Sequence, residues 1–199
     1  GEGGIGIIRI SGARAIEIVS MVFQARSAKR LGDLSSHALL YGQVRDPGTG
    51  DVIDEALVSV MRAPASYTRE DVVEINCHGS MMPLWRTVNL LIASGARQAE
   101  PGEFTKRAFL NGRIDLAQAE AVMDIIHAKT ELSHRAANEQ LLGGLSSEVA
   151  VLRDRLVSIV AAVEAGIDFP DEEIETPTGN PLADEVGSVL QSVDGLIAS

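Results

Sequence analysis

The spacing of apolar residues changes along the chain, and the first hundred residues show strand and helix patterns in turn. Residues 5–10 contain four isoleucines in six positions, which predicts a short, mostly buried strand. Apolar positions then recur at helical spacing from Ile16 to Phe23, and Ser11 is a candidate N-cap for that helix. The chain is therefore expected to begin with a strand followed by a helix.

The pattern up to residue 100 completes a β-α-β-β-β-α-β order, which predicts a two-layer α+β domain. Two strand-like runs at 38–45 and 52–62 flank a Pro- and Gly-containing turn sequence, as expected of a hairpin. The remaining predicted elements are a strand at 71–77, a helix at 81–93 that ends at Gly95, and a short strand at 97–100.

Beyond the α+β domain the apolar period is helical, which predicts an all-α bundle. A seam with alternating spacings of four and three runs from Leu145 to Val163 and is typical of paired helices. Pro170 is expected to end this helix, and Asn180 with Pro181 to begin the last one.

The boundary between the two parts is expected near Gly112, with an α+β domain at 1–112 and the first part of a helical domain at 113–199. Asp115 followed by Gln118 resembles a capping box at the start of a new helix. The last helix has an apolar stripe and no C-cap, so we expect the natural protein to continue beyond Ser199.

Charge is unevenly distributed along the chain. The formal net charge is −11, and nine acidic but no basic residues follow Arg155. The C-terminal part is therefore a poor surface for phosphate groups, while the rest is close to neutral and could hold a local basic site. The single cysteine, Cys77, cannot form an internal disulfide, and no secretory leader or membrane span is visible. These features predict a cytoplasmic location.

Two charged residues, Arg9 and Glu74, interrupt otherwise apolar strands. Each could lie on the polar face of the sheet, or the two could form a structural ion pair. Alternatively they form a ligand pair, because a carboxylate can accept two hydrogen bonds from an amino-pyrimidinone edge while arginine binds an anionic group.

Other motifs give little support for catalysis. Cys77 and His78 are neighbours, but adjacent strand residues face opposite ways, so structural roles are the simpler interpretation. The spacing of the four histidines and one cysteine matches no metal site, and no phosphate-binding P-loop motif occurs in the sequence. We therefore assign no catalytic residue and no metal ligand.

Four stretches in register resemble the MnmE (TrmE) family of tRNA-modification GTPases, and the resemblance extends over essentially the whole chain. They are residues 3–12, 66–79, 101–120 and 165–173.

This resemblance implies an N-terminal domain that forms a homodimer and binds 5-formyl-tetrahydrofolate. The positions that match the family's folate contacts are Arg9, Glu74 and Arg113, the last standing where some members have lysine. In the family, a GTPase domain that uses GTP, Mg²⁺ and K⁺ is inserted in the helical domain. With an FAD-containing partner (MnmG, also called GidA), the full protein modifies carbon 5 of the wobble uridine of certain tRNAs.

The 199 residues lack the GTPase domain and the second half of the helical domain. The resemblance therefore implies a chain that binds folate and dimerises but does not hydrolyse GTP. Two alternatives remain open: a folate-binding and dimerisation scaffold without chemistry of its own, and a protein similar to folate-dependent aminomethyltransferases.

Overall fold

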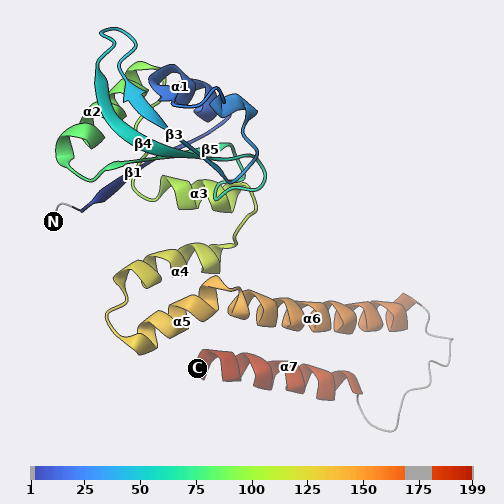
Figure 1. Cartoon of the computed structure of the whole chain (residues 1–199). Coiled ribbons are helices and arrows are strands. Elements are labelled where there is room, and N and C mark those ends of the chain that lie inside the picture. The colour runs from blue at the N-terminus through green and yellow to red at the C-terminus, as the bar shows by residue number, and fades with distance from the viewer. Residues whose placement is uncertain (1–2, 169–180, 199) are drawn as a thin grey trace. The chain divides into compact units, whose positions relative to one another are not determined.

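The computed structural model describes residues 3–168 and 181–198, which belong to two compact units, Gly1–Asp115 and Leu116–Ser199 (Figure 1). Pro170 and Asn180, expected to end one helix and begin the next, lie outside the described residues. Within the described ranges, no helix combines the length and the apolar character needed to cross a membrane.

The first unit is built on a five-stranded antiparallel sheet with the strand order β1-β5-β4-β3-β2. The predicted α+β class is confirmed, as are the hairpin and the helix that ends before Gly95. The elements are β1 (Ile5–Ser11), α1 (Ala15–Val22), β2 (Phe23–Ala25), η1 (Leu31–Asp33), β3 (Ala38–Arg45), β4 (Val52–Met61), β5 (Val72–His78), α2 (Met81–Ala93) and α3 (Glu103–Leu110).

One face of this sheet forms the core. Alternate residues of β5, such as Val73 and Ile75, are fully buried beside Val19 of α1 and Leu91 of α2. The other face carries Glu74 and several exposed apolar side chains, and α3 lies on that side of the sheet (Figure 1). Residues placed on this outer face are therefore available for binding.

Three details of the first unit differ from the sequence prediction. The predicted strand at 97–100 is wrong, since this segment pairs with no strand in the described sheet. The first helix begins at Ala15 after Arg14, so Ser11 ends β1 and is not the N-cap. Phe23 begins the short strand β2, where it is still buried, and so the helix ends earlier than its apolar pattern suggested.

The second unit is entirely helical among its described residues, as predicted. A break at Gly143, whose φ is 88°, separates α5 from the long α6, and Thr130 caps α5. No residue of α6 is fully buried, and Arg155 joins α6 to α7 through Glu185 at 2.7 Å. The helices are α4 (Leu116–His127), α5 (Glu131–Leu141), α6 (Gly144–Asp168) and α7 (Pro181–Ala198).

Candidate functional site

Arg9 and Glu74 lie directly opposite each other on β1 and β5. Nε of Arg9 donates to Oε1 of Glu74 at 2.8 Å, and Nη2 lies 2.6 Å from the same oxygen. The Arg9 side chain is 43% exposed and that of Glu74 is 22% exposed. The pair is thus open to solvent, and no bond to Oε2 of Glu74 is recorded within the described part of the chain.

Two aromatic rings lie close to the arginine of this ion pair. The guanidinium carbon of Arg9 lies 5.9 Å from the ring centre of Tyr67 and 5.7 Å from that of Phe104. The guanidinium carbon of Arg113 lies 4.8 Å from the centre of the same Tyr67 ring. Both predicted arginines therefore lie over Tyr67 at distances typical of cation–π contacts, and Glu74 joins them through its ion pair with Arg9.

Tyr67 and Phe104 were missed by the sequence reasoning, although a compositional signal exists. The whole chain has only two tyrosines and four phenylalanines. One of each lies in stretches that resemble the family motifs, and neither belongs to an apolar period that would explain it as core.

The position of Tyr67 depends on α3. Its hydroxyl lies 3.0 Å from Oγ1 of Thr105, and Nδ2 of Asn111 donates to the carbonyl of Thr68 at 2.6 Å. Thr105 lies near the start of α3 and Asn111 directly follows its end, so these two bonds fix the loop that carries Tyr67 to both ends of the helix. Thr68 in this loop is fully buried. The α3 helix thereby fixes the ring against the outer face of the sheet.

Arg113 is placed by the end of the same helix. Gly112 has φ 68°, a left-handed conformation that glycine adopts without strain, and the amide of Arg113 donates to the carbonyl of Ala108 at 2.9 Å. This C-terminal turn brings Arg113 to 4.8 Å from the centre of the Tyr67 ring.

A group of ion pairs joins α3 to the segments that precede it. Arg107 lies 2.9 Å from both Oε2 of Glu70 and Oε1 of Glu103. Hydrogen bonds from Arg97, from the Glu100 amide and from Arg107 hold the pKa of the Glu103 carboxyl well below its usual range. Glu103 is therefore ionised and structural, and it ties the segment before α3 to the helix.

Cys77 and His78 do not form a nucleophile and base. Cys77 faces the core, and burial followed by the negative charge of Asp54 raises its pKa to about 11. His78 faces the other way, with Nδ1 2.6 Å from Oδ1 of Asp54, and that bond raises the pKa of the imidazole. No cluster of three or more potential metal ligands is found in residues 3–168 and 181–198.

Comparison with known families identifies both units of the chain. Residues 1–113 match the family described as GTP-binding protein TrmE N-terminus, and residues 116–199 match the MnmE helical domain. The chain belongs to the MnmE family. The two matches meet where the structure divides into its two units.

Members of the MnmE family with similar sequences extend well beyond this chain. It is 50% identical to the tRNA modification GTPase MnmE of Carboxydothermus hydrogenoformans over all 199 residues, which are 43% of that relative. It is 54% identical to that of Alkaliphilus oremlandii over 175 residues, or 88% of the chain and 38% of the relative. The chain thus spans less than half the length of these relatives.

Proposed function

We propose that this chain supplies folate binding and dimerisation to a GTP-dependent tRNA-modification enzyme. The observation that carries the proposal is the Arg9–Glu74 pair, with the rings of Tyr67 and Phe104 close to Arg9 and with Arg113 over the same tyrosine ring. Such a site has the features that a flat, polar-edged ligand with an anionic tail requires.

Glu74 is the residue proposed to recognise the pterin of 5-formyl-tetrahydrofolate. Its Oε2 can accept a hydrogen bond from the amino-pyrimidinone edge, and Oε1 can accept another once Arg9 turns toward the ligand. Tyr67 and Phe104 offer faces on which a planar ring can pack. Arg9 and Arg113 then bind the polar and anionic parts of the folate.

The complete enzyme is proposed to act with an FAD-containing partner on carbon 5 of the wobble uridine of certain tRNAs. GTP, Mg²⁺ and K⁺ belong to the GTPase domain of such a protein, since this sequence contains no P-loop. In this proposal the folate supplies the one-carbon unit, and the residues of this chain bind and orient the folate.

Dimerisation is proposed to use the first unit. Its outer sheet face exposes Ile5, Ile7 and Leu39, which are 70%, 60% and 62% accessible. Several exposed apolar side chains on one face of a sheet are typical of protein interfaces. Sedimentation equilibrium should give a dimer, and a monomer at micromolar concentration would remove this part of the proposal.

Titration calorimetry with 5-formyl-tetrahydrofolate tests folate binding directly. The Glu74→Gln variant should lose at least about tenfold in affinity, because one amide oxygen cannot replace a carboxylate. Glu55→Gln is the matched control, since Glu55 also pairs with an arginine, Arg26, at 2.6 Å but lies outside the cluster. A folded wild-type chain that binds no folate would contradict the proposal.

A further inference from the structure

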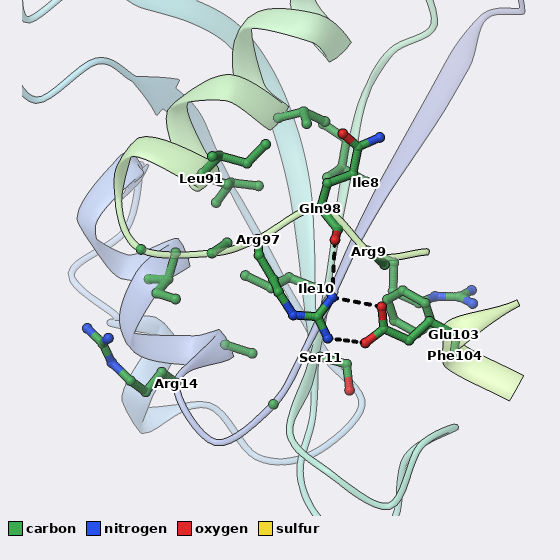
Figure 2. Close-up of a pocket in the computed structure, with 18 of the residues that line it drawn as sticks. Ile8, Arg9, Ile10, Ser11, Arg14, Leu91, Arg97, Gln98, Glu103 and Phe104 are labelled. Atoms are coloured by element: carbon green, nitrogen blue, oxygen red, sulfur yellow. Dashed lines mark hydrogen bonds and ion pairs between the residues drawn. The ribbon is translucent and has the colours of Figure 1, made fainter. Parts of the chain in front are cut away.

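A cavity of about 610 Å³ follows the free edge of β1 (Figure 2). Consecutive residues from Ile7 to Ala15 line it, so it faces the edge of the strand and continues to the start of α1. Residues 95–99 form the opposite wall. In the described sheet β1 is an outer strand, and this is its unpaired side.

The backbone of β1 presents hydrogen-bonding groups to this cavity. The amide of Gly12 donates to the carbonyl of Asp71, and the amide of Gly79 donates to the carbonyl of Gly4. The antiparallel register between these two points is unbroken, so even-numbered residues of β1 bond to β5. The N–H and C=O groups of the odd-numbered residues, including Ile7 and Arg9, therefore point toward the cavity.

The side chains of the cavity combine an apolar floor with a cationic rim. Ile8, Ile18 and Leu91 are buried beneath it. Four arginines line it against one acidic residue, Glu103. A ligand that suits it therefore has an apolar portion and carboxylates, and an amide chain would satisfy the strand edge.

Arg14, which lies where β1 leads into α1, is one of the rim arginines that keep an unused donor in the described part of the chain. Its Nε and Nη2 bond to Glu17 at 3.1 and 2.8 Å, while no bond from Nη1 is recorded within the described ranges. Nη1 lies 3.7 Å from the position that a Cβ on Gly95 would take, so the side chain reaches the opposite wall. Arg97 instead bonds to Glu103 and Gln98, as Figure 2 shows.

The cavity is continuous with the proposed folate site, because Arg9 and Phe104 line both. We infer that the cavity receives the p-aminobenzoyl-glutamate part of the folate, and that folates with several glutamates are the preferred form. This inference rests on the proposed folate binding. The ring packs on the isoleucines, the amides of the tail pair with β1, and its carboxylates bind Arg14.

Calorimetry with the mono- and triglutamate forms of 5-formyl-tetrahydrofolate tests the inference. The triglutamate should bind at least about tenfold more tightly to the wild-type chain, since each added residue brings an amide and a carboxylate. Arg14→Gln should reduce this ratio to about threefold or less. Glu17→Gln should increase it, because Arg14 would lose its competing carboxylate.

These calorimetry results distinguish the preference for polyglutamates from folate binding itself. Arg26→Gln is the control, since it removes an arginine that pairs with Glu55 and does not line the cavity. Equal affinities for the two forms, or a ratio that Arg14→Gln does not change, would overturn the inference while folate binding stands. Failure of both forms to bind would overturn the proposed function as well.

Discussion

The hydroxyl groups of Tyr67 and Thr105 lie 3.0 Å apart, which joins the loop before β5 to α3. The guanidinium carbons of Arg9 and Arg113 lie 5.9 and 4.8 Å from the centre of the Tyr67 ring, so this contact links the position of α3 to the arrangement of both arginines. The site therefore depends on how the helix docks as well as on the sheet.

Substitutions at Tyr67 should separate the role of the ring from that of the hydroxyl. Tyr67→Ala removes the face on which the pterin packs and is expected to weaken folate binding roughly tenfold. Tyr67→Phe keeps the ring and loses one hydrogen bond, so the free energy of unfolding should fall by about 1 kcal/mol with folate affinity nearly unchanged. Calorimetry and urea unfolding measure the two effects.

Tyr41→Ala provides the control for this pair, because Tyr41 also lies on the outer sheet face and bonds to a carboxylate, that of Glu55, at 2.7 Å. It should leave folate affinity unchanged. If Tyr67→Phe weakened folate binding as much as Tyr67→Ala, the hydroxyl and not the ring would be the contact.

Glu103 should make the stability of the first unit depend on acid pH. Its folded-state pKa is depressed, so its contribution is complete above the ordinary glutamate pKa of about 4.3 and declines as pH falls below that value. Glu103→Gln should therefore lower the urea midpoint at pH 7, with a smaller difference from wild type at pH 3. Glu131→Gln, which alters an exposed pair at 3.5 Å, should show no such difference. An equal loss at both pH values would argue against the ionised Glu103.

Much of the fold could be predicted because, within the strands and helices of the first unit, apolar residues recur at the spacing that places them on one buried face. The segment at 97–100 misled the prediction because an extended sequence does not reveal whether a neighbouring edge will pair with it. Here all four residues are exposed and Arg97 bonds to α3. Phe23 misled it because a residue at the end of a helix and the start of a strand can be buried in either conformation.

The charged half of the site was visible in the sequence, since Arg9 and Glu74 stand out in apolar strands. The aromatic half was not, because Tyr67 and Phe104 lie outside any strand or helix period that their neighbours share. Their meeting requires α3 to pack on the loop before β5, a contact between distant residues that no local pattern encodes. Arg113 was placed by resemblance, and its approach to Tyr67 depends on the turn at Gly112.

Asp54 should set the protonation of His78. The hydrogen bond and then the charge of Asp54 raise the imidazole pKa, so protonation favours the folded state. This stabilisation is complete below the unfolded pKa of about 6.5 and is lost as pH rises through the folded value. In Asp54→Asn, an NMR titration should give a lower pKa for His78, whereas Asp33→Asn should not change it. An unchanged pKa in Asp54→Asn would show that other groups control the imidazole.

Cys77 should behave as a core residue and not as a nucleophile. Its side chain is 3% exposed, and a pKa of about 11 keeps the thiol protonated at neutral pH. A thiol reagent at pH 8 should therefore label the folded chain very slowly and label it fully in urea. Cys77→Ser, which buries a hydroxyl, should lower the free energy of unfolding by about 1–3 kcal/mol, while Cys77→Ala should retain folate affinity. Rapid labelling of the folded chain, or a folded Cys77→Ala variant with lost folate binding, would instead give the thiol a direct role.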